Sequence, residues 1–160
     1  MASDKDLKKI LRKLEYGVYV VSMGKGADGN AFTASWVMQV ASEPPMVAAA
    51  VHNKHKSAWQ LADLDSFVVN LLPESGLATA KTYYGPAESG YDKLQAKDIS
   101  DADVTGTPRL NGALGYLDCK IVERVRTGNH TLFIGEVVGG ELTSDSPILT
   151  TSSSKLHYAG

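Results

Sequence analysis

The most regular pattern in the chain is an alternation of apolar and polar residues between positions 31 and 40. Successive side chains of a β-strand point to opposite faces, so a period of two predicts a strand with one buried face. The expected core face carries Phe32, Ala34, Trp36, Met38 and Val40. The opposite face carries the polar side chains of Thr33, Ser35 and Gln39.

Further apolar segments predict more strands, and strands outnumber helices. The predicted strands cover residues 17–23, 46–51, 66–72, 113–125 and 130–138, with a turn at Thr127-Gly128-Asn129 between the last two. Helical patterns cover residues 56–64 and 74–84, and the Gly-, Pro- and Asp-rich stretch 85–112 is expected to be a long loop. Because no βαβ alternation recurs, the pattern predicts a mainly β fold, an antiparallel barrel with a few surface helices.

One amphipathic helix is predicted near the start of the chain. Leu7, Ile10, Leu11 and Leu14 recur at helical spacing, and Ser3 or Asp4 can cap the first turn. Lysine and arginine side chains occupy the other faces, as in helices that lie on membranes. The preferred interpretation is a helix that packs on the protein and exposes its basic face to solvent.

A glycine motif that resembles a dinucleotide-binding fingerprint lies between Gly24 and Gly29, where the sequence spells G-x-G-x-x-G. In that fingerprint a helix must follow the glycines, so that its N-terminus faces the pyrophosphate. Here the alternating strand pattern follows instead. The motif therefore predicts a hairpin loop.

Length, charge and cysteine content narrow the classes of function. The 160 residues fit one domain over residues 1–160, and a net charge of −2 offers no basic excess for nucleic acid. The single Cys119 excludes an intramolecular disulfide, and it alternates with Leu117 and Ile121 as a buried residue would. With neither a leader sequence nor a membrane-spanning segment in view, the expectation is a cytoplasmic protein with no membrane partner.

Several segments, taken in order, carry a resemblance to a known family. They are Phe32-Thr33-Ala34-Ser35-Trp36, Pro44-Pro45, the Lys56-Ser57 turn, residues 67–72, Gly112-Ala113 and residues 128–137. From about residue 10 to 149 this order resembles the flavin reductase-like, split-barrel FMN-binding family. The resemblance implies an antiparallel split β-barrel of the Greek-key type. It also implies a homodimer with one FMN per subunit near the interface.

The resemblance places FMN on two segments of this chain. Thr33, Ala34, Ser35 and Trp36 should line the flavin ring and ribityl chain, although Trp36 also fits the core. The turn that contains Asn53, Lys54, Lys56 and Ser57 should hold the phosphate. Two lysines, a hydroxyl and the start of a helix suit an anion. Tyr83 or Tyr84 lies where family members contact the cofactor.

The same resemblance places a nicotinamide beside the turn Gly128-Asn129-His130 and makes His130 the candidate catalytic residue. Family members carry an acidic residue where this chain has Asn129, and the amide changes the local charge. The C-terminal segment 147–152 also lacks the aromatic and arginine-rich sequence of many family reductases, and Tyr158 comes late. These departures weaken the expectation that the protein uses NAD(P)H, but they do not weaken the expectation that it binds FMN.

Two functions are therefore expected. The first is an NAD(P)H:flavin oxidoreductase that transfers a hydride to the flavin. The second is an FMN-binding electron-transfer module that relays electrons between a separate reductase and an acceptor protein, because residues 14–21 resemble the subgroup fused to rubredoxin or flavodiiron proteins. A planar ligand such as heme is a third alternative. His52 and His55 lack the companions of a metal site, so no metal is expected.

Overall fold

The structure, a computed structural model, describes residues 1–26, 29–85 and 94–158. Its centre is a seven-stranded antiparallel sheet with the order β2-β1-β5-β8-β9-β4-β3. The strands are β1 (Tyr19–Met23), β2 (Asn30–Ala34), β3 (Val37–Ser42), β4 (Pro45–His52), β5 (Ser66–Leu71), β8 (Gly115–Thr127) and β9 (His130–Leu142). The mainly β, antiparallel fold is confirmed, and the loop after Gly24 leads into strand β2 as expected.

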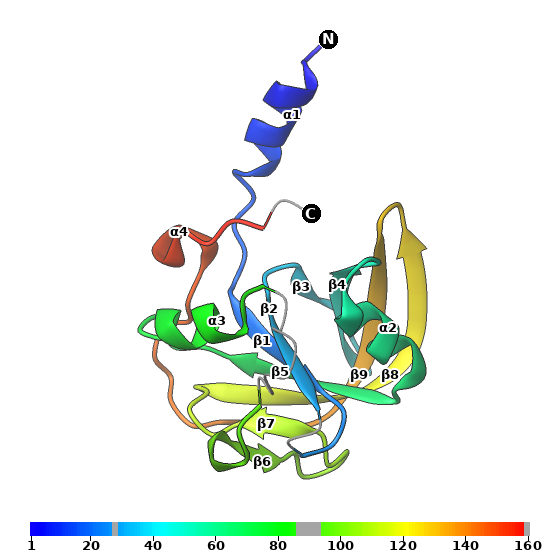
Figure 1. The fold of residues 1–160 in the computed structure, drawn as a ribbon, viewed down its shortest axis with the longest axis vertical. Coiled ribbons are helices and arrows are strands. Elements are labelled where there is room, and N and C mark those ends of the chain that lie inside the picture. Colours follow the sequence, from blue (N-terminus) through cyan, green and yellow to red (C-terminus); the bar gives the residue numbers. More distant parts are fainter. Residues whose placement is uncertain (27–28, 86–93, 159–160) are drawn as a thin grey trace.

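The sheet closes on itself where the chain passes from β2 to β3. These two strands follow one another in sequence but lie at opposite edges of the sheet. Only Ser35 and Trp36 separate them, and the Trp36 carbonyl accepts a hydrogen bond of 2.9 Å from the amide of Ala50 in β4. The curled sheet in Figure 1 is therefore a barrel with its seam at Ser35-Trp36.

The single strand predicted over residues 31–40 is wrong, because the seam interrupts it. Met38 and Val40 were expected in the core, but they are 65% and 44% exposed. Val37 packs against the core instead, and the register shifts again between Gln39 and Ala41. Each interruption moves side chains to the other face, since the period of a strand is two residues.

The barrel interior is filled by apolar side chains from all the long strands. Val21, Phe67 and Phe133 belong to this cluster, as does the small side chain of Cys119. Gly135 is required where β9 crosses the cluster, because a Cβ there would lie 2.8 Å from both the Cys119 Cβ and the Phe67 Cζ. A second cluster lies under α3 (Leu77–Tyr83).

Helix α1 (Asp4–Leu11) forms as predicted, but it does not pack on the barrel. Ser3 caps it: its hydroxyl accepts from the Asp6 amide, and the Asp6 carboxylate accepts from the Ser3 amide. None of its residues is buried, and it projects from one end of the molecule in Figure 1. The packed-helix interpretation is therefore wrong for the single chain, and the stripe from Leu7 to Leu14 is left exposed.

The predicted long loop contains regular structure in the part that is described. A short 3₁₀ helix, η2 (Ala96–Asp98), precedes a small hairpin of β6 (Ile99–Asp101) and β7 (Pro108–Leu110). The buried Asp118 carboxylate accepts hydrogen bonds from the amides of Val104 and Thr105 at 3.1 and 3.0 Å, which fixes the hairpin to β8. Strands of three residues show no readable period, so the sequence pattern missed them.

Two further helices complete the fold. α2 (Lys56–Asp63) was predicted, and α4 (Thr151–Ser154) was not. After α4 the chain turns back past the base of α1 toward the barrel (Figure 1). Among the described residues, no helix is long and apolar enough to cross a membrane.

Candidate functional site

The barrel seam holds a buried hydroxyl without a protein partner. The Ser35 side chain is 6% exposed, and its Oγ has no hydrogen-bond partner among the residues that the structure describes. Leaving a buried polar group unsatisfied costs about 1–3 kcal/mol. Ala34 beside it is also buried, and Trp36 is half-buried. The seam therefore offers an unused hydrogen-bonding group, which a ligand can satisfy.

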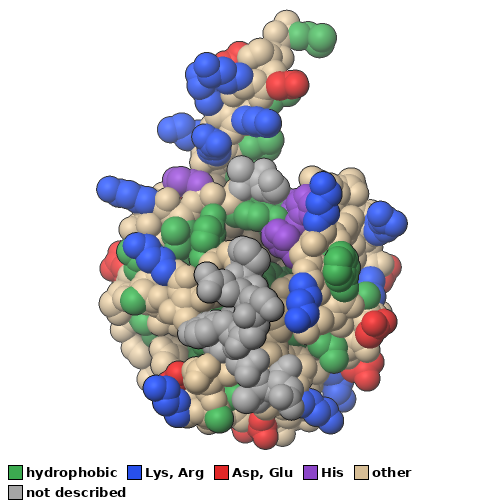
Figure 2. All heavy atoms as spheres, in the orientation of Figure 1, with side chains coloured by type: hydrophobic (Ala, Val, Ile, Leu, Met, Phe, Trp, Pro, Cys, Tyr) green, Lys and Arg blue, Asp and Glu red, His purple; other side chains and the backbone are tan. Residues whose placement is uncertain are grey.

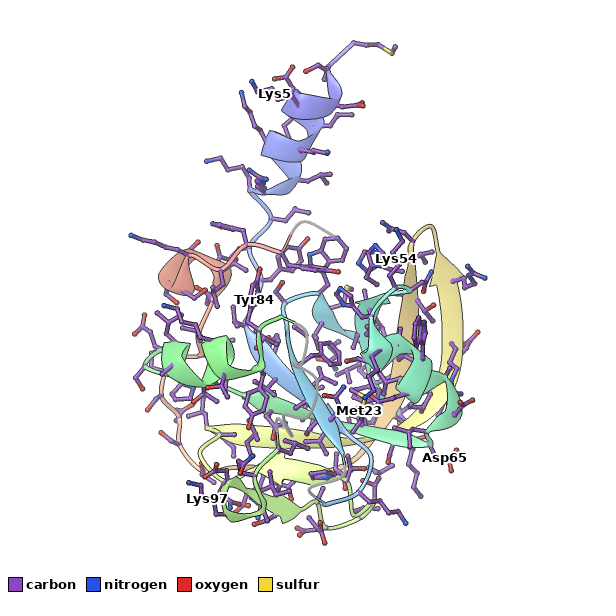
Figure 3. The ribbon with its side chains drawn as sticks, viewed as in Figure 1. Lys5, Met23, Lys54, Asp65, Tyr84 and Lys97 are labelled. Carbon is purple, nitrogen blue, oxygen red and sulfur yellow. The ribbon has the colours of Figure 1, made fainter. Side chains whose placement is uncertain are left out.

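Thr33 is tied to the neighbouring helix. Its hydroxyl donates a hydrogen bond of 2.5 Å to the carbonyl of Ala80 in α3. This bond holds the polar side of β2 against the helix that carries the predicted tyrosines. Tyr83 packs in the core cluster under α3, whereas Tyr84 is 51% exposed and lies near the end of the barrel from which α1 projects (Figure 3). Of the pair, Tyr84 is therefore the one whose side chain is exposed.

The predicted phosphate corner is built on the turn between β4 and α2. The Asn53 amide donates to the carbonyl of Asn129 at 2.9 Å, and its side-chain oxygen accepts from the Thr131 hydroxyl at 2.7 Å. These bonds hold the turn against the start of β9. The lysines of this corner, Lys54 and Lys56, are exposed, and Figure 3 shows Lys54 at the same end of the molecule as Tyr84.

Ser57 lies in the first turn of α2 and is buried. Its hydroxyl oxygen lies 3.3 Å from the Asn30 side-chain nitrogen, which donates to it, so Ser57 can still donate its own proton. No side chain caps the start of α2. The corner therefore offers two ammonium groups, a hydroxyl and helix amides.

His130 is brought into contact with Trp36 and Tyr158, which come from distant parts of the chain. Strand pairing sets His130 opposite His52, and the two-residue turn before it needs a positive φ of 55° at Gly128. The His130 ring centroid lies 4.8 Å from that of Trp36 and 5.0 Å from that of His52. Figure 2 shows histidine side chains gathered beside lysines and arginines at this end.

Both ring nitrogens of His130 are engaged. The side-chain oxygen of Asn129 lies 2.7 Å from Nδ1, and because this oxygen only accepts, Nδ1 carries the proton. Nε2 is left as an acceptor, and the Tyr158 hydroxyl donates to it at 3.0 Å. Burial, followed by the charges of His52 and His55, lowers the pKa of His130 below its ordinary value of 6.5. The ring is therefore neutral at pH 7.

The sequence offered Tyr158 only as a late aromatic residue of the C-terminal segment, yet its side chain contacts His130. Its ring packs edge-on against Trp36 with the centroids 4.9 Å apart, and burial raises the pKa of its phenol. The hydroxyl therefore stays protonated and acts as the donor. A lone tyrosine in a polar C-terminal segment carries no periodicity, so no sequence signal could have joined it to His130.

Comparison with known proteins places the chain in a family. The sequence profile described as "Flavin reductase like domain" matches residues 11–159. The chain belongs to this family. It is similar to the NADH-dependent FAD reductase of Streptomyces globisporus, with 29% identity over 134 residues, 82% of this chain and 72% of that protein. A structure of the Streptomyces globisporus NADH:FAD oxidoreductase superposes with a TM-score of 0.84 at 25% identity, over 94% of this chain and 90% of that one.

A second group of relatives is much longer. Diflavin flavoprotein A 1 of Synechocystis sp. is 30% identical over 142 residues, which cover 87% of this chain but 24% of that protein. This flavin reductase-like domain therefore spans about a quarter of the length of the diflavin flavoproteins that it matches. Both the family resemblance and the split-barrel fold are confirmed.

The residues of this flavin reductase-like domain fit a flavin nucleotide. The unpartnered Ser35 hydroxyl lies beside a half-buried indole at the seam, and the lysine corner supplies positive charge for a phosphate. Cys119 is buried, and burial with the Asp118 charge raises the pKa of its thiol to about 12. The thiol is therefore not a nucleophile at pH 7.

The paired histidines do not extend into a metal site in the described residues. The rings of His52 and His55 lie 5.4 Å apart, and no group of three or more His, Cys, Asp or Glu side chains suited to a metal occurs there. His52 accepts a hydrogen bond of 3.1 Å from the Lys54 amide through Nδ1. Its interactions shape the phosphate corner.

Proposed function

We propose that this domain binds FMN and acts as an NAD(P)H:flavin oxidoreductase. The observation that carries the proposal is the buried, unpartnered Ser35 hydroxyl at the seam beside Trp36. A hydroxyl in this position gains a hydrogen bond when the polar edge of a flavin ring arrives. Bound FMN would supply the redox chemistry by accepting a hydride from NAD(P)H.

The proposed FMN site runs from the seam to the lysine corner. Thr33, Ala34, Ser35 and Trp36 would contact the ring and ribityl chain. Lys54 and Lys56 would attract the phosphate, and Ser57 with the α2 amides would donate to its oxygens. Asn53 holds the turn through Thr131, and the exposed Tyr84 of the tyrosine pair would cover the ligand.

His130 would orient the nicotinamide of NAD(P)H. Its Nε2 is an acceptor, and the carboxamide N–H of a nicotinamide is a matching donor. Gly128 makes the tight turn, and Asn129 fixes the tautomer in which Nε2 is unprotonated and can accept from the nicotinamide once the Tyr158 hydroxyl is displaced. His130 therefore positions the substrate ring while remaining neutral.

The electron-relay function is the second candidate, and one observation favours it. The Tyr158 hydroxyl already occupies Nε2 of His130, where a nicotinamide would bind. In a relay this contact would persist, and electrons would reach the flavin from a separate redox protein. Matches to diflavin flavoproteins, in which the aligned segment is part of a longer chain, also support this candidate.

One anaerobic experiment separates the two functions. The protein is saturated with FMN, and NADH or NADPH is added while the visible flavin absorbance is recorded. Bleaching within seconds supports the oxidoreductase, whereas absorbance that falls only after a separate reductase is added supports the relay. If the protein retains neither FMN nor FAD after incubation with excess of either, both candidates fail.

We propose further that residues 1–160 fold as one domain and that the protein is a cytoplasmic homodimer. The apolar stripe of α1 is exposed in the single chain, with Leu7 at 48% and Ile10 at 62%, and the edge strand β3 exposes Met38. Exposed apolar surface of this extent is typical of association sites. In the proposed dimer a second copy would cover Leu7, Ile10 and Met38.

A further inference from the structure

A cavity of about 440 Å³ adjoins the His130 cluster on the side of α1. Trp36 and Tyr158 line it, and the same two rings pack against His130. The remaining walls come from the end of α1 and from the C-terminal tail. The cavity therefore shares Trp36 and Tyr158 with the proposed nicotinamide position and extends away from it.

Among the described residues, the ionisable lining of the cavity includes basic side chains without acidic ones to balance them. Lys8 in α1 and Arg12 directly after it contribute basic groups, and His157 contributes an imidazole from the tail. No aspartate or glutamate is among the described residues that line it. A cavity with basic groups on two walls favours an anionic ligand.

Aromatic and aliphatic side chains form the rest of the lining. Tyr16, Trp36 and Tyr158 present rings, and Leu11 and Leu14 present apolar surface. Flat aromatic walls bind heterocyclic rings by stacking. A ligand that combines a flat base with phosphates matches both properties, and a volume near 440 Å³ falls in the usual range for small-molecule sites.

Two of the walls are held together by hydrogen bonds between Tyr16 and Thr151. The Thr151 amide donates to the Tyr16 carbonyl at 2.9 Å, and the Tyr16 amide donates to the Thr151 hydroxyl at 3.2 Å. Glu15 directly precedes Tyr16 in sequence, and its carboxylate accepts a hydrogen bond of 3.1 Å from the Ser152 amide. Hydrogen bonds from Ser152 lower the pKa of Glu15, so its carboxylate is ionised and engaged by α4.

We infer that this cavity binds the ADP half of the nicotinamide dinucleotide. The pyrophosphate would lie against Lys8 and Arg12, and the adenine would stack among Tyr16, Trp36 and Tyr158. This inference rests on the proposed function, because the nicotinamide of the same molecule would lie at His130. Because Trp36 and Tyr158 both line the cavity and pack against His130, the nicotinamide dinucleotide is favoured over FAD as the source of the ADP group.

A matched pair of double variants on α1 tests this assignment. Lys8→Gln with Arg12→Gln removes the two charges that line the cavity. Lys9→Gln with Lys13→Gln removes two charges at the same spacing nearby, from residues that do not line it. In FMN-saturated protein, the first pair should weaken ADP binding measured by calorimetry roughly tenfold and raise the KM for NADH and NADPH similarly. In the control pair, ADP binding and the KM values should remain near those of wild type. In both pairs, the kcat values and the affinity for FMN should also remain near those of wild type.

The opposite wall supplies an independent variant. His157→Glu lies in the C-terminal tail and places a negative charge in the cavity without altering α1. It should also weaken ADP binding and raise the KM for the nucleotide. Equal effects of the two α1 pairs, or no effect of Lys8→Gln with Arg12→Gln and of His157→Glu, would overturn the inference.

The outcomes separate this inference from the proposed function. If wild type oxidises NADH but does not bind ADP in the cavity, the inference fails and the oxidoreductase stands. If wild type binds ADP through Lys8 and Arg12 but does not oxidise either nucleotide, the oxidoreductase fails and the adenine nucleotide site stands. If the variants weaken the binding of FAD relative to that of FMN and leave the KM for NADH unchanged, the cavity binds the adenylate part of FAD and the inference is wrong.

Discussion

The hydroxyl of Tyr158 donates a hydrogen bond of 3.0 Å to Nε2 of His130, across 28 positions of sequence. With Asn129 on Nδ1, this contact gives the imidazole a defined tautomer and a filled acceptor position. The C-terminal tail therefore acts directly on the residue proposed to orient the nicotinamide. A substrate that uses Nε2 has to displace the tyrosine first.

Tyr158→Phe should make the nicotinamide position easier to occupy. The ring would still pack against Trp36, but Nε2 of His130 would lose its internal donor. A lost hydrogen bond of this kind is worth about 1 kcal/mol, so the KM for NADH should fall roughly fivefold. Steady-state kinetics at saturating FMN would measure it. An unchanged or higher KM would show that Tyr158 does not compete with the nicotinamide.

Acid should weaken both folding and nucleotide binding through His130. Burial lowers its folded-state pKa below 6.5, so the unfolded chain takes up the proton first as the pH falls. The contribution to stability is complete above about pH 6.5 and declines as the pH falls through the folded-state pKa. Protonation also removes the Nε2 acceptor, so the KM for NADH should rise over the same interval.

Denaturant unfolding of wild type and His130→Gln between pH 5 and pH 8 would measure this contribution. His130→Gln should reduce the decline in stability on the acid side, because glutamine does not titrate. The same decline in both proteins would assign it to other groups.

Ser35→Ala should separate ligand binding from folding. The hydroxyl has no partner among the described residues, so its removal should leave the unfolding free energy of the apo-protein within about 0.5 kcal/mol or raise it. The affinity for FMN should fall roughly fivefold if the flavin uses this group. Ser42→Ala, an exposed serine of β3, is the matched control. Loss of stability with unchanged FMN affinity would make Ser35 a structural residue.

Lys54→Gln with Lys56→Gln should weaken only the binding of the FMN phosphate group. Both side chains are exposed, so folding should be unaffected. The affinity for FMN should fall roughly tenfold, whereas riboflavin, which lacks the phosphate, should bind wild type and variant equally. Lys120→Gln on β8 is the control substitution. Equal losses for FMN and riboflavin would place the lysines against another part of the ligand.

Leu7→Glu with Ile10→Glu should convert the proposed dimer to a monomer. These side chains are exposed and no residue of α1 is buried, so the barrel should keep its melting temperature once it is monomeric. Light scattering coupled to size-exclusion chromatography would report the mass. A monomeric wild type would refute the proposed dimer, and a dimeric variant would show that the interface does not involve α1.

The local pattern of apolar and polar residues was sufficient to predict elements whose pattern continues without interruption along their length. Residues 46–51 and 66–72 run through buried positions and became β4 and β5, and the capped stripe that begins at Leu7 became α1, which ends at Leu11. The strand pattern after the glycine motif at Gly24 excluded a dinucleotide-binding turn, and strand β2 follows the loop in the structure. The pattern did not show whether α1 is covered, since amphipathicity defines a face without naming what lies against it.

The sequence by itself determined that the chain is a mainly β protein, because alternating and continuous apolar runs report which way each side chain points from its own backbone. It also pointed to the Lys56-Ser57 corner and to His130, through short motifs in a fixed order. Only the tertiary structure decided that the chain changes sheet edge at Ser35-Trp36, leaving a buried hydroxyl unpaired and Met38 exposed. Tyr158 met His130 only through folding, because contacts between distant residues depend on strand order and closure, which no local period encodes.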